Sequence, residues 1–397
     1  MGIRQLLSLV TAVMFSAVSL FLGVGSASAT TTGPETVVSG TFLRNVAFTP
    51  DGDEVWITAY SDKKLRGFTT DSAQTSLGAI DLPGTPEGIV ILPDGIHAVV
   101  PMSDLNDLAY VNLDTAVVTR PFATSADYPA DIALSPDGEY VAVSYFFGRE
   151  ATIFSLSDFS IVDTWDTSGK AATVTYTPDG STILVTDYDS NVVRAYIPGL
   201  DLPVQFSVGA GPFGQAFAPD ASRYLVVNSG DNTITDFSGD ELATASITTR
   251  AAGTQVQFAS FTPDGSQVWV MAMGESKIRI YDAYDWTEQT AIDIGGMPRQ
   301  VVFTPDGCQA YVSLESANSI VRYQLDPCLA PATVDDGDGD GDGDGDIAGV
   351  GDGEIVEKSL ANTGTDSLAG FATVAGALAL LMVGASLLLL RRRALGR

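Results

Sequence analysis

The stretch FTPDG at Phe48–Gly52 occurs again, letter for letter, at Phe261–Gly265 and at Phe303–Gly307. Four looser copies lie between the first and the second: ILPDG, LSPDG, YTPDG and FAPDA. Their prolines follow one another at intervals of 41–44 residues: Pro50, Pro93, Pro136, Pro178, Pro219, Pro263 and Pro305. A period of this length indicates a repeat architecture, with one structural unit for each copy.

Each unit has the pattern of β-structure. A short apolar segment such as NVAF precedes the turn, and a segment rich in β-branched and aromatic residues, such as EVWITAY, follows it. Proline favours the second position of a type I turn and glycine takes the left-handed conformation that follows, so each PDG predicts a hairpin between a first and a second strand. Ala221 replaces the glycine in the fifth unit, where we expect either a strained residue or a different turn.

Third and fourth strands, such as VVRAYI and QTAIDI, complete a four-stranded unit, which is typical of a β-propeller blade. The seventh unit has no fourth strand, because its third strand is followed by the Pro- and Asp/Gly-rich PCLAPATVDDGDGD. The segment ETVVSGTF (Glu35–Phe42) stands before the first turn, where a fourth strand is expected. We therefore predict an all-β, seven-bladed propeller in which an N-terminal strand completes the last blade and removes an open sheet edge.

The two cysteines of the chain, Cys308 and Cys328, both fall in this last unit. A hairpin that turns near Asn318 would place them opposite each other on neighbouring strands, within the reach of a disulfide. We expect a bond that joins the second and third strands of the closing blade.

The composition is acidic, with 20 Lys+Arg against 49 Asp+Glu and a formal net charge of −29. Such a chain repels a phosphate backbone, so nucleic acid is not an expected partner. Residues 1–29 carry Arg4, a long apolar run and an Ala-Ser-Ala ending, which together predict a secretory signal peptide cleaved before Thr30, with an uncleaved anchor as the alternative.

The C-terminal part reads LANTG at Leu360–Gly364, an uncharged apolar segment at residues 368–390, and a basic tail at residues 391–397. The apolar segment is long enough to span a bilayer as a helix, and a plain C-terminal membrane anchor, which would keep the protein in the membrane, is the alternative. The three parts in this order resemble the LPXTG cell-wall sorting signal of Gram-positive bacteria, with Ala361 in place of the proline. The resemblance implies that a sortase cuts between Thr363 and Gly364 and joins Thr363 to peptidoglycan, so that the protein is anchored in the wall at the cell surface. The motif residues are Leu360, Ala361, Asn362, Thr363 and Gly364.

Between the repeats and this signal lies an acidic spacer at residues 329–359, which contains DDGDGDGDGDGD. Its carboxylates alternate as in calcium-binding loops, but Ile347 takes the place of the bidentate glutamate of an EF-hand. We expect an extended, disordered spacer, with weak calcium association as a side alternative. The propeller itself is assigned to residues 34–328.

Several second strands resemble the YVTN-type β-propeller repeat, in which a PDG turn precedes a YVSN-like strand. YVSLE at Tyr311, YVAVS at Tyr140 and YLVVNSG at Tyr224 carry this resemblance. Members of that family are mostly surface or exported proteins, and related seven-bladed propellers include lactonases. The resemblance implies a fold and leaves the function open.

The residues six and five positions before each turn proline should converge on one mouth of the central channel. Among them Arg44, Glu87, Asp131 and Arg299 would share the rim, where arginines near acids could hold a carboxylate or a sugar acid. The alternative is a solvated rim whose charges neutralise one another. The chain has one histidine, His97, and no recognisable catalytic motif, so we assign no catalytic residues, no metal site and no cofactor.

These observations favour a surface-anchored, non-enzymatic binding or adhesion module whose ligand is an extracellular protein or glycan. The sequence leaves two alternatives open. One is a lactonase-like hydrolase with a carboxylate-bound metal in the channel. The other is a structural component of a surface layer.

Overall fold

The computed structural model describes residues 30–330, except Thr41, Ser125, residues 198–201, 240–241 and 243–244. The expected signal peptide, nearly all of the spacer, the sorting motif, the apolar segment at 368–390 and the basic tail lie outside these residues. Within the described part of the chain, no helix is long and apolar enough to cross a membrane.

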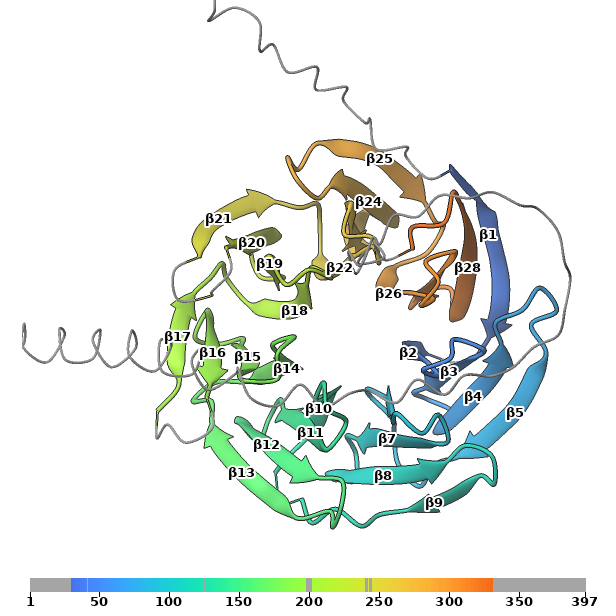
Figure 1. Cartoon of the computed structure of the whole chain (residues 1–397), viewed down its shortest axis with the longest axis vertical. Coiled ribbons are helices and arrows are strands. Elements are labelled where there is room, and N and C mark those ends of the chain that lie inside the picture. The colour runs from blue at the N-terminus through green and yellow to red at the C-terminus, as the bar shows by residue number, and fades with distance from the viewer. Residues whose placement is uncertain are drawn as a thin grey trace, which may run out of the picture. The chain divides into compact units, whose positions relative to one another are not determined.

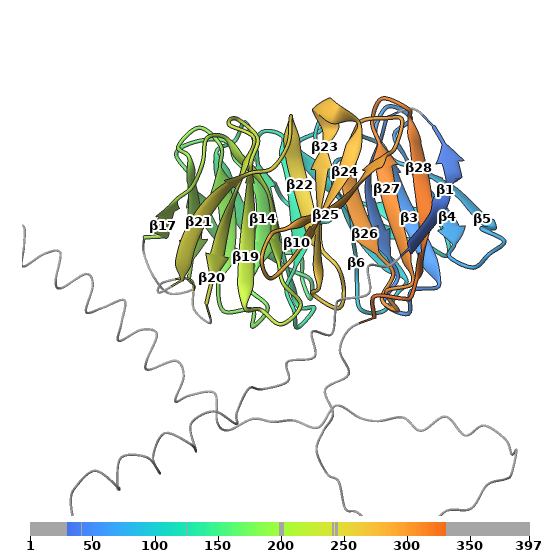
Figure 2. The same cartoon turned by 90° about the horizontal axis from the view of Figure 1, so that it is seen from above.

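The described residues form seven four-stranded antiparallel sheets arranged in a ring around a central opening (Figure 1). The inner strands, such as β19 and β22, run roughly along the ring axis, and the outer strands, such as β21 and β25, are tilted against it (Figure 2). The fold is therefore the predicted seven-bladed propeller, and its regular structure is β apart from a single-turn 3-10 helix at Met273–Glu275.

The first blade contains β2 (Leu43–Phe48), β3 (Glu54–Ala59), β4 (Lys64–Thr69) and β5 (Ser76–Asp81), and the second contains β6 (Val90–Ile91), β7 (His97–Met102), β8 (Asp107–Asn112) and β9 (Val117–Thr119). The third blade contains β10 (Pro129–Leu134), β11 (Tyr140–Tyr145), β12 (Glu150–Ser155) and β13 (Ile161–Asp166), and the fourth contains β14 (Ala171–Tyr176), β15 (Ile183–Asp187), β16 (Val192–Tyr196) and β17 (Val204–Ser207). The fifth blade contains β18 (Pro212–Phe217), β19 (Arg223–Asn228), β20 (Thr233–Ser238) and β21 (Ser246–Ala251), and the sixth contains β22 (Val256–Phe261), β23 (Gln267–Ala272), β24 (Lys277–Asp282) and β25 (Glu288–Asp293). The seventh blade contains β26 (Pro298–Phe303), β27 (Gln309–Leu314), β28 (Ser319–Asp326) and the N-terminal strand β1 (Thr30–Ser39).

Burial changes from the inside of each blade to the outside. The second strands, such as β11 and β27, are buried at nearly every position, because both of their faces pack against neighbouring blades. The fourth strands β13 and β21 are almost wholly exposed. This explains why the second strands read as continuous apolar runs and carry the clearest repeat signal in the sequence.

The ring is closed by the N-terminal strand, as the sequence predicts. β1 pairs antiparallel with β28 from Thr30↔Asp326 to Ser39↔Ser319, so it begins earlier than the expected Glu35. In Figure 1 β1 lies beside β28 although the two are separated by most of the chain. At this seam the buried guanidinium of Arg322 pairs with Glu35 and donates to the backbone oxygens of Thr70 and Asp71.

The repeated turns also hold neighbouring blades together. In the first turn the Thr49 hydroxyl donates to Asp51, and Gly52 has a φ of 78°. A Cβ added to Gly138 in the third turn would lie 2.5 Å from Cγ of Pro93 in the turn of the preceding blade. Each PDG thus makes a hairpin, and in the first and third turns the glycine also leaves room for the proline of a neighbouring turn. In the last turn, Gly307 instead leaves room for the backbone of Leu329. Ala221 keeps the same turn with a φ of 59°, so of the two possibilities left by the sequence, a strained residue and a different turn, the strained residue is the one present.

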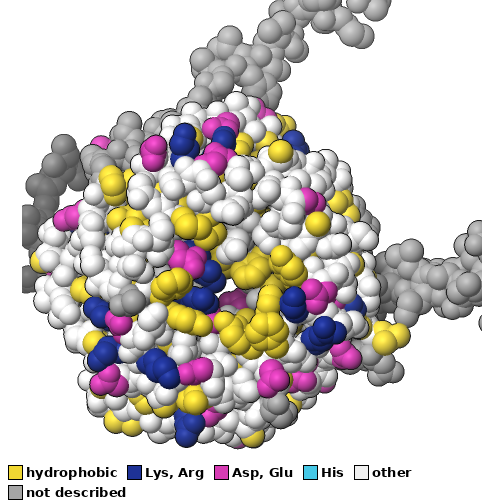
Figure 3. All heavy atoms as spheres, turned by 180° about the vertical axis from the view of Figure 1, so that it is seen from behind, with side chains coloured by type: hydrophobic (Ala, Val, Ile, Leu, Met, Phe, Trp, Pro, Cys, Tyr) yellow, Lys and Arg dark blue, Asp and Glu magenta, His cyan; other side chains and the backbone are white. Residues whose placement is uncertain are grey.

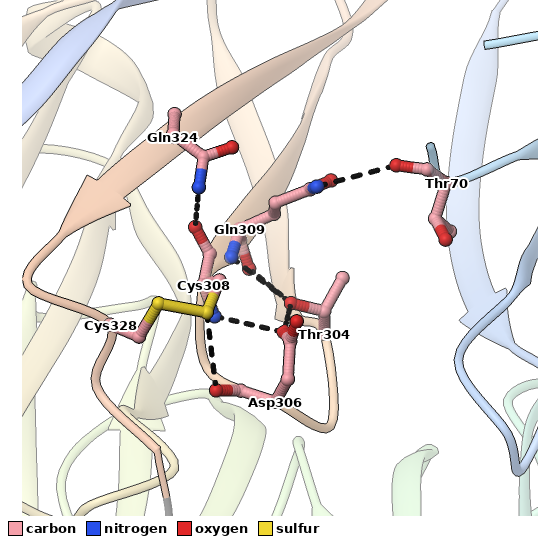
Figure 4. Close-up of a disulfide and its surroundings, with 7 residues drawn as sticks. All are labelled: Thr70, Thr304, Asp306, Cys308, Gln309, Gln324 and Cys328. Atoms are coloured by element: carbon pink, nitrogen blue, oxygen red, sulfur yellow. Dashed lines mark hydrogen bonds between the residues drawn. A yellow bond between two sulfur atoms is a disulfide. The ribbon is translucent and has the colours of Figure 1, made fainter. Parts of the chain in front are cut away.

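The expected disulfide between Cys308 and Cys328 is present, with a Cα–Cα distance of 4.2 Å. The strand register behind the expectation is wrong, however, because Gln309 faces Gln324 and the hairpin therefore places Cys308 opposite Leu325. Cys328 lies beyond the end of β28, where the chain continues beside the last PDG turn and Leu329 donates to Gly307. Figure 4 shows the bond joining this tail to Cys308, next to Asp306 and Gln324.

Candidate functional site

A bulge at the start of most of the innermost strands releases residues at the channel mouth from the strand ladder. In β2 the ladder skips from Leu43 to Val46, which leaves Arg44 and Asn45 unpaired with β3. Related irregularities occur in the first strands of five other blades, β10, β14, β18, β22 and β26. In the second blade Glu87 lies ahead of the short strand β6. A bulge re-aims side chains that a regular ladder would place on a sheet face.

Hydroxyl groups of the second strands stabilise these bulges. The hydroxyl of Thr58 accepts a hydrogen bond from the backbone N–H of Asn45, at 2.9 Å. The hydroxyl of Ser313 does the same for Gln300, at 3.1 Å. These bonds satisfy backbone donors that the ladder has left free, so the bulge does not leave a buried N–H unpaired.

The bulged residues surround a cavity of about 210 Å³. Its lining combines charged, amide and aromatic side chains from several blades: Arg44, Asn45, Glu87, Tyr128, Ala130, Asp131, Phe146, Phe147, Ala172, Thr173, Phe213, Gln257, Phe258 and Arg299. The space-filling view from behind Figure 1 shows hydrophobic and charged side chains bordering the central opening (Figure 3).

Glu87 is fully engaged in its contacts. Its carboxylate forms an ion pair with Arg44 and accepts a hydrogen bond of 2.7 Å from the hydroxyl of Tyr128. The guanidinium of Arg44 also lies over the ring of Tyr60, 3.9 Å from its centroid. Burial and the neighbouring Glu87 raise the pKa of Tyr128, so this phenol stays protonated.

Arg299 is less well satisfied. Its side chain is 13% exposed, and its ion pair with Glu315 is long, at 3.7 Å. No hydrogen bond from Arg299 to another described residue is present, and its Nε is buried without a partner. Burial, with the charge of Arg44 nearby, lowers the pKa of Arg299 from its usual value. The pocket thus contains a guanidinium that is poorly neutralised by the protein.

Asp131 lies on β10 between the second and fourth blades. Its Oδ2 accepts a hydrogen bond of 3.1 Å from the backbone N–H of Val174 in the next blade. Burial raises the pKa of Asp131 to about 7, although the hydrogen bond and Arg299 act in the opposite direction. In the last blade, Gln300 accepts from the backbone N–H of Val46 in the first blade through its neutral amide. Asp131 therefore has an inter-blade structural role and can also change charge near neutral pH.

Aromatic rings form much of the remaining lining, and two of them contact the charged groups. Tyr128 donates to Glu87, and the guanidinium of Arg299 lies 5.6 Å from the ring centroid of Phe258. Phe147 packs edge-on against Tyr128 and against Phe146, with centroid distances of 5.1 and 5.2 Å. Phe213 packs edge-on against Phe258 at 5.5 Å. The rings come from the loops and bulges of the third, fifth and sixth blades.

The structure brings the four predicted rim residues, Arg44, Glu87, Asp131 and Arg299, into one cavity. Their role in binding a ligand stays a prediction. Sequence reasoning placed the FGRE loop at Phe147 on the outer rim of the same face, but it did not single out Tyr128 or the aromatic character of this side. The signal was present in the FF of SYFFGRE, since two adjacent phenylalanines in a predicted loop have no core to enter.

A carboxylate-bound metal, as in the hydrolase alternative, finds no ligand set here. Among residues 30–330 as described, no three His, Cys, Asp or Glu side chains gather in a way that could hold a metal ion. Glu87 uses both carboxylate oxygens for Arg44 and Tyr128, and Asp131 uses one for Val174. Both carboxylate oxygens of Glu87 and one of Asp131 are thus engaged in protein contacts.

Comparison with known proteins gives one family. The model of the family described as "Lactonase, 7-bladed beta-propeller" matches residues 230–383, which is less than half of the chain. Within the described residues this match runs from the fifth blade to the end of the seventh, and it agrees with the seven-bladed architecture. No curated protein matches the chain.

Proposed function

We propose that the channel mouth binds a small ligand through a carboxylate group, which is held by Arg299 with Arg44 beside it. The observation that carries this proposal is the state of Arg299, a largely buried guanidinium without a hydrogen bond to any described residue. A buried charge whose pairing is incomplete is costly, and an anion that enters the cavity would reduce that cost. A guanidinium also presents paired N–H groups that match a carboxylate.

The same cavity limits the size of the ligand. A cavity of about 210 Å³ admits a small ligand or a single group of a larger one. A large glycan or a protein partner would insert at most one residue or sugar acid into the mouth. The size of the cavity supports the proposal that the propeller binds a small acidic group at the channel mouth.

We further propose that this propeller is displayed at the surface of a bacterial cell wall. The signal-peptide pattern, the LANTG motif with its apolar segment and basic tail, and the acidic spacer support this proposal. Wall fractions should contain the protein covalently linked, and Thr363→Ala should leave it in the membrane or release it. Covalent wall attachment of the Thr363→Ala protein would refute the sorting assignment.

Calorimetric titration of the purified full chain with acetate, D-gluconate and benzoate tests the binding proposal. We expect at least one of these carboxylates to bind, and Arg299→Gln to weaken its affinity ten- to a hundredfold, about 1.4–3 kcal/mol. Arg120→Gln is the matched control, because Arg120 is half exposed and pairs with Asp107 on the outside of a blade. Equal binding by the Arg299→Gln variant would refute the proposal.

A second candidate function is the hydrolysis of a small lactone without a metal. The family match favours it, and so does the raised pKa of Asp131, which is suited to a general base near neutral pH. Asp131 would take a proton from a water that attacks the lactone carbonyl. The ring C–O bond then breaks, and Asp131 returns the proton to the leaving oxygen. The product is a hydroxy acid, whose carboxyl group releases a proton to the solvent and whose carboxylate fits Arg299.

Proton release from glucono-δ-lactone and γ-butyrolactone, followed by pH-stat, separates the two functions. Hydrolysis predicts turnover above the rate in buffer, and a loss of at least a hundredfold in Asp131→Asn. A rate equal to buffer for both lactones, together with carboxylate binding, supports the binding function alone.

A further inference from the structure

We infer that the carboxylate ligand carries a compact apolar ring, aromatic or alicyclic, of about the size of benzoate. This inference rests on the carboxylate site proposed above and adds the class of ligand. It comes from one position of the repeat, six residues before each turn proline, whose cavity-lining side chains are charged in three successive blades and apolar in the next three. These two sets of side chains are called the charged half and the apolar half.

The charged half follows three successive blades around the seam of the ring. Arg299 lies in the seventh blade, Arg44 in the first and Glu87 in the second, at equivalent positions of the repeat. The ion pair of Arg44 with Glu87 links the first and second blades directly. A carboxylate on Arg299 therefore lies at one side of the cavity rather than at its centre.

The apolar half follows the next three blades. The equivalent positions there are Ala130, Ala172 and Phe213, of which the two alanines leave room and the phenylalanine supplies a wall. Phe146 and Phe147 of the β11–β12 loop complete this wall, and Phe146 lies 6.1 Å from the ring of Tyr188. A planar or compact ring inserted between these side chains would meet aromatic edges and faces at the usual packing distances.

Phe147 is the clearest indication that this half receives a ligand. Its side chain is 57% exposed although it lines the cavity. When an apolar ligand binds beneath a large exposed aromatic side chain at the rim of a concave site, apolar surface of that side chain is removed from water, which favours binding. Its rigid edge-on contacts with Tyr128 and Phe146 hold it in that position.

A polyhydroxylated acid suits this half less well. The hydroxyl of Thr173 is already shared with Thr186 and with the backbone oxygen of Phe213, and the alanines and phenylalanines offer no hydrogen bonds. Asp131 follows Ala130 in the third blade, and its Oδ2 already accepts from the backbone N–H of Val174. Sugar hydroxyls placed against the alanines and phenylalanines would lose water without gaining partners there. Gln257 of the sixth blade also lines the cavity, and its buried Oε1 has no partner among the described residues.

Titration of the full chain with four acids tests the inference: acetate, D-gluconate, benzoate and cyclohexanecarboxylate. We expect the two ring acids to bind at least tenfold more tightly than acetate and gluconate. Phe147→Ala should weaken benzoate binding three- to tenfold and leave acetate unchanged. Tyr284→Ala is the control, because Tyr284 is an aromatic residue that is 95% exposed and lies outside the cavity.

The outcomes distinguish this inference from the proposal beneath it. If gluconate binds as tightly as benzoate, or Phe147→Ala leaves benzoate affinity unchanged, the ring-bearing ligand is refuted while the carboxylate site stands. If benzyl alcohol binds as tightly as benzoate and Arg299→Gln has no effect, the carboxylate site itself fails.

Discussion

At the scale of single residues, Asp131 couples the fold to the site. It accepts a backbone hydrogen bond from the next blade and lines the cavity with Arg299, so its charge affects both. Gln300 in the last blade accepts the corresponding hydrogen bond, from the backbone N–H of Val46, through a neutral amide. The hydrogen bond between the blades therefore does not need Asp131 to be ionised.

This leads to a prediction about pH. The pKa of Asp131 is raised from 3.8 to about 7, so between these values the native protein holds a proton that the unfolded chain has released. Its contribution to stability is therefore lost as the pH rises towards 7. Asp131→Asn should remove this loss, so that the stability difference between variant and wild type moves in favour of the variant from pH 5 to pH 8.

Urea unfolding at pH 5 and pH 8 measures this difference. Asp114→Asn is the control, because Asp114 is exposed and its side chain forms no hydrogen bond or ion pair with another described residue. A difference between wild type and Asp131→Asn that is the same at both pH values would contradict the raised pKa.

Ala221 gives a second prediction at this scale. Its φ of 59° is left-handed, which costs an L-residue about 1–2 kcal/mol, whereas glycine avoids most of this cost and loses about 0.5–1 kcal/mol through the flexibility of the unfolded chain. Ala221→Gly should therefore stabilise the protein by about 0.5–1 kcal/mol in urea unfolding. The reverse change in an equivalent turn, Gly138→Ala, should destabilise it by more, because its Cβ would also collide with Pro93. A destabilised Ala221→Gly variant would refute the strain.

At the scale of elements, the seam between the last blade and the first depends on side chains from both ends of the ring. Arg322 on β28 is 9% exposed and joins Glu35 of β1 to the β4–β5 connection through Thr70 and Asp71. Gln309 on β27 also donates to Thr70, at 3.3 Å. The seam thus has polar contacts in addition to the pairing of β1 with β28.

We predict that Arg322→Gln lowers the free energy of unfolding by about 2 kcal/mol or more, because it removes buried charged hydrogen bonds. Glu35→Gln should cost less than about 1 kcal/mol, since Glu35 is 59% exposed. Chemical denaturation of both variants gives the comparison. An Arg322→Gln protein as stable as wild type would show that strand pairing alone holds the seam.

At the scale of the whole molecule, closure makes the two ends of the repeat region one cooperative unit. Removal of residues 30–42 would leave β28 as an open edge and expose the last blade to pairing with other chains. We predict a lower thermal midpoint, a broader transition and concentration-dependent aggregation, measured by circular dichroism and light scattering. An unchanged midpoint without aggregation would contradict closure by β1.

The sequence by itself determined the number of blades, the β character of each unit and the closure at the N-terminus. These follow from local chemistry, because the PDG turns and the apolar second strands each report on their own short segment. The predicted rim positions followed from the same repeat, since equivalent residues of a ring must lie at the same height.

Only the tertiary structure decided what these positions do together. The register of the last hairpin, which places Cys308 beside a chain that continues past its strand, depends on contacts beyond β28. The neutralisation of Glu87, the incomplete pairing of Arg299 and the aromatic wall around Phe147 depend on side chains from different blades. Such distances between blades are set by the packing of the ring, and no local pattern in the sequence encodes them.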